Sequence, residues 1–303
     1  MPQAPSNGIT LEYESHGPEI AEPILLIMGL GAQMTRWPAP LYEKLVARGH
    51  RVIRFDNRDV GLSTKLESAG AVDMAALLVA LQAGRQPAVP YLLADMAADA
   101  VGLLDHLGVE RAHIVGASMG GMIAQLVAAD YPRRTLSLTS IMSSTGNPAL
   151  PRATPEAMAV ISGRPPDPGA DMEGFLDHSV KSSLTIGSPG FPFPDGALRA
   201  RVRADYQRSY CPAGFLRQYA AIVASGDRRA KLRGVTAPTV VLHGREDPLV
   251  PLAGGEDTAA HIPGAELRVV PGMGHDVPPG LYDTVVEAIM AAVARSRAPG
   301  QRP

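Results

Sequence analysis

The stretch that decides the fold is Gly116-Ala117-Ser118-Met119-Gly120. It lies between a short apolar run, 112–115, and a segment with helical composition, 122–130. A serine on a tight turn between a strand and a helix projects its hydroxyl group at the edge of a sheet. The flanking Gly116 and Gly120 leave room for the strand and the helix to cross closely. In this setting the pentapeptide predicts that Ser118 is a nucleophile, although the same string alone also occurs in ordinary turns.

Length and composition indicate a folded protein with a substantial core. The chain has 303 residues, of which 46% are hydrophobic, and this length suits one large domain that carries an insertion. The 28 basic and 30 acidic residues give a net charge of -2, without a basic run. This balance argues against nucleic acid as a partner.

The cysteine count and the lengths of the apolar runs indicate where in the cell the protein is expected. Cys211 is the single cysteine, so the chain cannot form an intramolecular disulfide, and we expect it to be a packing residue. Residues 1–10 lack the features of a signal peptide, and the apolar run 24–30 is too short to span a bilayer. The sequence therefore predicts a cytoplasmic protein that does not engage a membrane. The eight histidines are scattered without the spacing of metal ligands, so no metal site is predicted.

Strand and helix patterns alternate along most of the chain. Buried strands read as continuous apolar runs, and helices show apolar residues at three- and four-residue spacing. A strand, a helix and a strand in succession imply a parallel sheet and hence an α/β fold. The expected strands are 9–14, 24–28, 51–55, 112–115, 135–142, 238–244 and 266–270, and the clearest helices are 42–48, 91–107, 122–130 and 283–293.

The alternation stops between the strands 135–142 and 238–244. There the sequence gains prolines and helix-like pieces, notably 196–206 and 214–224, and it holds four of the five phenylalanines. We therefore predict a helical cap over 144–236, inserted into a core domain made of 1–143 and 237–303. One or two of the aromatic rings of the cap are expected to face a pocket.

A nucleophilic serine needs a base, and the base needs an orienting acid. On a parallel sheet both belong on loops at the carboxyl ends of later strands. His275 follows the last strand in the loop 271–275 and is the predicted base. Asp247, in the loop after the strand 238–244, is the predicted acid, with Glu246 as the alternative. His243 precedes Asp247 by four residues, which is too close to face it easily across the serine.

The chain order Ser118, Asp247, His275 is the order found in α/β-hydrolases. Over residues 9–294 the sequence resembles the α/β-hydrolase superfamily, and this implies a mostly parallel eight-stranded sheet flanked by helices, with an inserted cap. Two further segments, 28–31 and 56–63, are similar to family motifs, although Met28 replaces a histidine and Asp59 replaces a glycine. The pair Arg58 and Asp59 resembles the aclacinomycin methylesterase group of small esterases.

The resemblance also implies the remaining parts of the site. The backbone N–H groups of Leu30 and Met119 would form the oxyanion hole, and the start of a helix at Met119 favours negative charge there. The implied activity is that of a serine carboxylic ester hydrolase, which acts through an acyl-enzyme on small to medium apolar esters. No metal or organic cofactor is implied, and the expected partner is a small-molecule ester.

Several alternatives remain open at this point. Gly29 and Gly31 after an apolar strand, with Asp56 at the end of the next strand, imitate a dinucleotide-binding motif, but Met34 occupies the place of the third glycine, so no NAD is expected. The same triad also serves lactonases, cofactor-free perhydrolases and hydrolases of carbon–carbon bonds. A small-molecule receptor on this fold is a non-enzymatic alternative.

Overall fold

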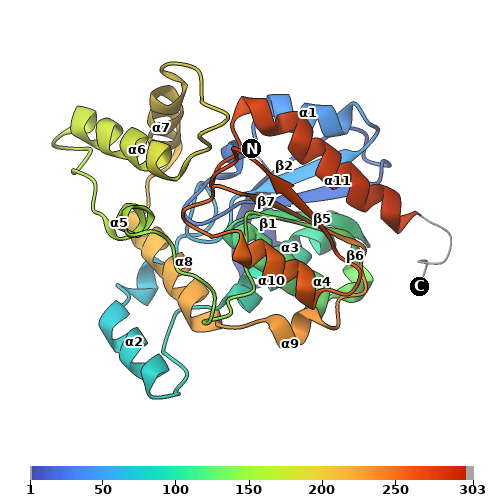
Figure 1. The fold of residues 1–303 in the computed structure, drawn as a ribbon, viewed down its shortest axis with the longest axis horizontal. Coiled ribbons are helices and arrows are strands. Elements are labelled where there is room, and N and C mark those ends of the chain that lie inside the picture. Colours follow the sequence, from blue (N-terminus) through green and yellow to red (C-terminus); the bar gives the residue numbers. More distant parts are fainter. Residues whose placement is uncertain (1, 298–303) are drawn as a thin grey trace.

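The computed structural model describes residues 2–297 and contains one eight-stranded sheet (Figure 1). The strand order is β1-β2-β4-β3-β5-β6-β7-β8. β1 pairs with β2 and β2 with β4 in antiparallel fashion, and every other pairing is parallel. The strands are β1 (Gln3–Ser6), β2 (Ile9–His16), β3 (Pro23–Ile27), β4 (Arg51–Phe55), β5 (Ala112–Ala117), β6 (Thr135–Ile141), β7 (Thr239–Gly244) and β8 (Glu266–Val270). The predicted mostly parallel eight-stranded sheet is confirmed.

The central strands are buried on both faces, as their continuous apolar runs predict. Every residue of β4, β5 and β7 is buried, because helices cover both sides of the sheet. The carboxyl ends of the six parallel strands β3 to β8 lie at one edge. The loops that follow β3, β5, β7 and β8 therefore meet at that edge and bring distant parts of the chain together.

Two helical layers enclose the sheet. α1 (Ala39–Val46) and α11 (Tyr282–Ser296) pack on one face, over a core cluster that includes Leu41 and Ile289. α3 (Leu93–His106) and α4 (Met119–Asp130) pack on the other face, over a second cluster that includes Leu104 and Ile123. α9 (Arg229–Leu232) contacts α4, and α10 (Ala253–His261) contacts β7, β8 and α9.

Four longer helices lie between β6 and β7, in the region predicted to be the cap. They are α5 (Pro155–Ser162), α6 (Met172–Ile186), α7 (Ala197–Arg208) and α8 (Pro212–Ser225). In Figure 1 α5, α6 and α7 lie to one side of the sheet, away from α4 and α11. Near the end of the predicted cap range, Leu232 and Val235 are buried in the same core cluster as residues of α4. The predicted core range also includes residues 1 and 298–303, which lie outside the described residues.

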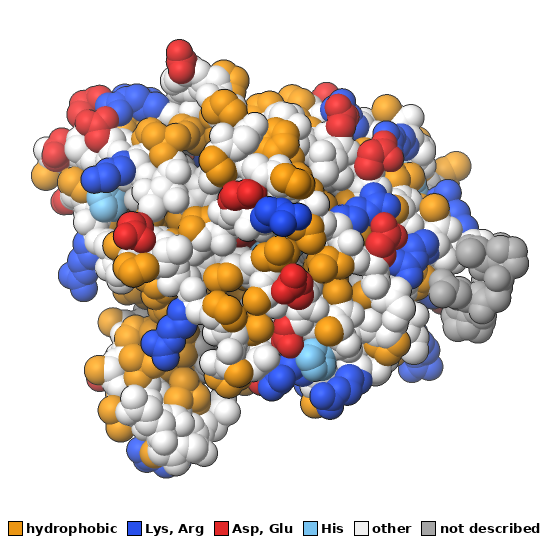
Figure 2. Space-filling view, viewed as in Figure 1, with side chains coloured by type: hydrophobic (Ala, Val, Ile, Leu, Met, Phe, Trp, Pro, Cys, Tyr) orange, Lys and Arg blue, Asp and Glu red, His pale blue; other side chains and the backbone are white. Residues whose placement is uncertain are grey.

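α2 (Met74–Gln82) has no counterpart among the elements expected from the sequence. Its residues are almost all apolar, so no helical stripe stands out, and Asp73 caps it by accepting a hydrogen bond from the Ala76 amide. α2 contacts α8. Its Leu78 and Val79 side chains remain 50% and 58% exposed. The lobe at the lower left of Figure 2 is largely hydrophobic or neutral with few charged groups, while the rest of that face mixes acidic and basic groups. Within residues 2–297, no helix combines the length and apolar character needed to cross a bilayer.

Candidate active site

Ser118 sits at the turn between β5 and α4 in a strained backbone conformation. Its φ is +57° and its ψ is -121°, a region that non-glycine residues seldom adopt. The turn is possible because its neighbours lack side chains: a Cβ on Gly116 would lie 2.0 Å from the Gly120 carbonyl oxygen. A Cβ on Gly120 would lie 2.2 Å from the Ile27 carbonyl oxygen. The glycines of the pentapeptide are thus required for the close crossing of β5, α4 and β3.

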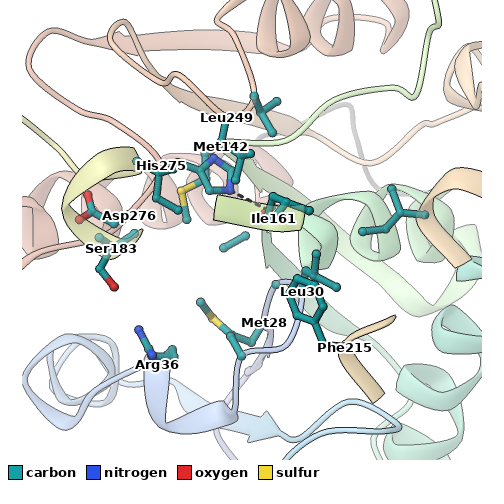
Figure 3. Close-up of a pocket in the computed structure, with 18 of the residues that line it drawn as sticks. Met28, Leu30, Arg36, Met142, Ile161, Ser183, Phe215, Leu249, His275 and Asp276 are labelled. Atoms are coloured by element: carbon teal, nitrogen blue, oxygen red, sulfur yellow. Dashed lines mark hydrogen bonds between the residues drawn. The ribbon is translucent and has the colours of Figure 1, made fainter. Parts of the chain in front are cut away.

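The structure brings Ser118, His275 and Asp247 together at the carboxyl edge of the sheet. The Nε2 of His275, which is labelled in Figure 3, lies 2.8 Å from the Ser118 Oγ. The Nδ1 of His275 lies 2.7 Å from the Asp247 Oδ2. Because the carboxylate can only accept, Nδ1 carries the proton and Nε2 is left to accept the hydroxyl proton. The buried Asp247 is itself fixed, since its Oδ1 accepts hydrogen bonds from the amides of Leu249 and Val250 at 2.9 and 2.8 Å.

Glu246 and His243, which the sequence also offers as acid and base, make other contacts. Glu246 is exposed, and its Oε2 accepts a hydrogen bond from the Gly272 amide at 2.6 Å. His243 is fully buried, and burial lowers its pKa, so it is neutral and donates from Nε2 to the Val250 carbonyl at 2.7 Å. Its Nε2 is 3.7 Å from the Asp247 Oδ2. His243 therefore supports the loop that carries the acid, a role that sequence reasoning did not assign.

Residues that precede α7 hold the loop that carries His275. The His275 amide donates to the Ile186 carbonyl at 2.7 Å, and the Gly274 amide donates to the Ser188 Oγ at 2.9 Å. The approach is tight, because a Cβ on Gly274 would lie 2.2 Å from the Gly187 carbonyl oxygen. The histidine is thus positioned from outside the sheet as well as from β8.

The two amides expected to form an oxyanion hole flank Ser118. Met119 is the first residue of α4, where an N–H group has no intrahelical acceptor and lies at the positive end of the helix dipole. Leu30 follows Gly29, whose missing side chain lets the backbone approach: a Cβ there would lie 3.1 Å from the Ser118 Cβ. Leu30 and Ser118 line the same cavity.

A buried glutamine of α8 supports the loop that carries Leu30. The Oε1 of Gln218 accepts a hydrogen bond from the Gly31 amide at 2.8 Å, and its Nε2 donates to the Arg58 carbonyl at 2.7 Å. Gln218 has no exposed surface. From the core side, the Asn57 Nδ2 donates to the Met28 carbonyl at 2.9 Å. The sequence carried one signal for Gln218, which is a polar residue on an otherwise apolar helix face.

Asp59, which departs from the family motif, ties the same region to α8. Its φ is +69°, a conformation that glycine adopts without strain, as the family motif would have it here. Its carboxylate accepts hydrogen bonds from the Nε and Nη2 of Arg217 at 2.8 and 2.7 Å, and from the Tyr91 hydroxyl at 2.7 Å. The bonded Asp59 carboxylate raises the pKa of Arg217, while burial followed by the Asp59 charge raises the pKa of Tyr91, so both remain donors. This buried cluster joins the loop after β4 to the region over the site.

A cavity of about 360 Å³ opens above Ser118 and His275. Most of its lining is apolar, and the residues Met28, Leu30, Met142, Ile161, Phe215 and Leu249 are representative (Figure 3). Two aromatic residues of the predicted cap line it, Phe215 and Tyr219. The rings of Phe175, Tyr206 and Tyr210 pack against one another instead, with centroids 5.4 to 5.7 Å apart. The polar lining residues besides the catalytic candidates are Arg36, Ser183, Arg201 and Asp276.

A second cluster of titratable groups lies at the amino ends of the strands. One ligand atom each from Glu22, His50 and His113 lies within 4.8 Å of the others, so these residue types could hold a metal ion. Glu22 is already paired with Arg297 and lies 3.1 Å from the Nε2 of His113. Burial lowers the pKa of His113 to about 4, which keeps it neutral. This group was not predicted, because its members come from the starts of three different parallel strands, where no local pattern links them.

Comparison with known proteins agrees with this architecture. Residues 22–167 match the family model described as the alpha/beta hydrolase fold. A meta-cleavage product hydrolase of Pseudomonas fluorescens has a similar structure, with a TM-score of 0.74 at 20% identity over 98% of each chain. At that identity the likeness speaks for the fold alone.

Two curated relatives extend over most of the chain. A rhodomycin D methylesterase of Streptomyces peucetius is 29% identical, over 93% of this chain and 94% of the relative. A 2-hydroxy-6-oxononadienedioate/2-hydroxy-6-oxononatrienedioate hydrolase of Cupriavidus pinatubonensis is 30% identical, over 84% of this chain and 81% of the relative. The predicted resemblance to this superfamily and to its small methylesterases is confirmed, and the chain belongs to the α/β hydrolase fold family.

Proposed function

We propose that the protein is a serine carboxylesterase. The observation that carries the proposal is the continuous chain of hydrogen bonds from the Ser118 hydroxyl through His275 to Asp247, at 2.8 and 2.7 Å. Ser118 and His275 line a mostly apolar cavity. A nucleophile, a base and an orienting acid in this geometry are the parts that acyl transfer requires. The methylesterase relatives support an ester as the substrate.

The reaction follows from the placement of these groups. The Ser118 Oγ attacks the ester carbonyl while His275 accepts its proton at Nε2, and Asp247 stabilises the resulting imidazolium. The amides of Leu30 and Met119 stabilise the oxyanion. The imidazolium then protonates the departing alcohol, and water, activated by the same histidine, releases the acid from the acyl-enzyme. The mostly apolar cavity of about 360 Å³ suits small to medium esters.

Hydrolysis of a carbon–carbon bond is the second candidate. The observation that favours it is the 30% identity to the Cupriavidus dienedioate hydrolase. To separate the two activities, kcat/KM of the purified protein is measured with a methyl ester and with a vinylogous 1,5-diketone. A carbon–carbon hydrolase turns over the diketone, whereas an esterase turns over only the methyl ester.

The proposal is tested with Ser118→Ala and a short-chain p-nitrophenyl ester. We expect the wild type to release a burst of p-nitrophenol and the variant to lose about 10⁴-fold or more in turnover, because the acyl-enzyme cannot form. Ser68→Ala, at an exposed turn, is the matched control and keeps full activity. Circular dichroism checks that the variant is folded. Turnover that survives in folded Ser118→Ala overturns the assignment.

A further inference from the structure

Arg201 is a charged residue of the cavity wall that has no hydrogen-bond or ion-pair partner among residues 2–297. It lies on α7 and lines the cavity above Ser118. Its Nε is buried without a hydrogen-bond partner among the described residues, and its guanidinium stacks on the Phe193 ring, with Cζ 4.6 Å from the centroid. No carboxylate of residues 2–297 lies within ion-pair distance of it. Arg201 as a whole is half-buried, and a buried guanidinium nitrogen without a partner is uncommon, so it calls for an explanation.

The nearby carboxylates are engaged elsewhere. Asp205, one helical turn after Arg201, accepts hydrogen bonds from the Nε of Arg36 at 2.7 Å and from the Thr35 hydroxyl at 3.1 Å. Asp276 accepts a hydrogen bond from the Ser188 hydroxyl, and burial raises its pKa. Both carboxylates attract Arg201 at longer range, but neither is paired with it by an ion pair or hydrogen bond.

The charge of Arg201 persists at neutral pH. Burial, with the neighbouring Arg36 as the next contribution, lowers its pKa to about 10, which still leaves the guanidinium protonated at pH 7. Arg36 also lines the cavity, but its charge is paired with Asp205, so Arg201 is the cavity arginine left without an ion pair among residues 2–297. In Figure 3 Arg36, Ser183 and Asp276 lie on one side of the cavity, away from Leu30 and Phe215. The cavity is thus divided into an apolar wall and a polar wall.

We propose that Arg201 binds a carboxylate of the substrate, so that the preferred substrates are half-esters of dicarboxylic acids. This proposal rests on the proposed esterase function of the same cavity. The ester carbonyl would lie at Ser118, an apolar linker would lie along the apolar wall, and the free carboxylate would accept hydrogen bonds from the guanidinium, whose planar fork suits that group. Hydrolysis with one water would then release an alcohol and a dicarboxylate.

The test compares esters that differ only in charge. Monomethyl esters of succinic, glutaric, adipic and pimelic acids are paired with neutral methyl esters of the same chain length, and kcat/KM is measured for each. We expect Arg201→Gln to lower kcat/KM about 10- to 100-fold on the best half-ester and less than about threefold on its neutral partner, because a charge-assisted hydrogen bond is lost only with the anion. Arg201→Lys is expected to retain part of the preference.

Arg203→Gln is the matched control. Arg203 lies on the same helix, but its side chain is 45% exposed and pairs with Glu173, so both substrate series are expected to stay unchanged. The proposal is overturned if Arg201→Gln lowers kcat/KM equally on half-esters and neutral esters, or lowers it on neither series. If Arg201→Gln does not fold, a wild type and an Arg201→Lys variant without any preference for half-esters overturn it as well.

A binding measurement separates this proposal from the esterase assignment. Ser118→Ala is titrated calorimetrically with monomethyl adipate and with methyl hexanoate, neither of which it can turn over if the assignment is right. We expect the half-ester to bind more tightly, and the difference to disappear in Ser118→Ala/Arg201→Gln. Equal binding of both ligands overturns the anion site whatever the activity data show. Selective binding by a protein that hydrolyses no ester supports the anion site and contradicts the esterase.

Discussion

The two ends of the parallel sheet each bring a histidine beside a carboxylate, but at the carboxyl end a serine hydroxyl and a cavity also adjoin the histidine. At the carboxyl end, His275 lies between Ser118 and the buried Asp247, at 2.8 and 2.7 Å. At the amino end, the Nε2 of His113 lies 3.1 Å from Glu22. Convergence of parallel strands produces both pairs, because the starts and the ends of such strands gather at opposite edges.

The surroundings of the two pairs differ in three physical respects. Asp247 is buried and accepts hydrogen bonds from two backbone amides, whereas the Glu22 side chain is one-third exposed and forms an ion pair with Arg297. The Ser118 hydroxyl and a cavity adjoin His275. His113, in contrast, is fully buried in the sheet, and its Nδ1 is hydrogen-bonded to the Ser137 hydroxyl at 2.8 Å. A histidine next to a carboxylate therefore becomes a base only where a nucleophile and space for a substrate adjoin it.

The largest expected effect separates the two histidine sites. His275→Gln removes the base next to Ser118 and should lower kcat on a p-nitrophenyl ester about 10⁴-fold or more, with the fold intact. His50→Gln, at the other end, should leave kcat within about threefold, because His50 contacts the Glu22 carbonyl and not the cavity. Steady-state kinetics and thermal melts of both variants provide the measurement. A comparable loss of kcat in the two variants would contradict the contrast between the ends.

The sequence predicts the carboxyl end well because its signals are local. The glycines around Ser118 mark a turn that no larger residue can make, and a Cβ at Gly116 or Gly120 would collide with backbone. His275 and Asp247 stand directly after β8 and β7, whose apolar runs are easily located. Once the strands are placed, the parallel topology forces these loops to one edge.

The remaining features depend on contacts that local patterns do not record. Gln218 and Arg217 reach the loops after β3 and β4 from a helix far along the chain, and neither has a spacing relation to its partner. The group of Glu22, His50 and His113 arises from strand starts, where single histidines look like ordinary core residues. α2 escapes prediction because its uniformly apolar sequence lacks the periodicity that marks a surface helix.

An intermediate effect is expected from the support that only the carboxyl end receives. Gln218→Met removes the acceptor of the Gly31 amide and should lower kcat about tenfold with little change in KM, because the neighbouring Leu30 amide then points less accurately at the oxyanion. Gln218→Glu keeps the acceptor and should recover part of kcat. Gln207→Met, on the exposed side of α7, is the control. A change confined to KM would show that Gln218 only shapes the cavity.

The smallest effect on turnover belongs to the amino end, where the consequence is expected in stability. The pKa of His113 is lowered to about 4, so below its ordinary value of 6.5 the unfolded chain binds a proton that the folded chain refuses. The free energy of unfolding should therefore fall as the pH decreases from about 6.5 to about 4, by up to about 3 kcal/mol from this residue. Urea unfolding at several pH values should show a shallower decrease for His113→Gln than for the wild type, with kcat at neutral pH unchanged. Parallel curves, or an NMR titration of the His113 ring near pH 6.5, would contradict a buried neutral imidazole.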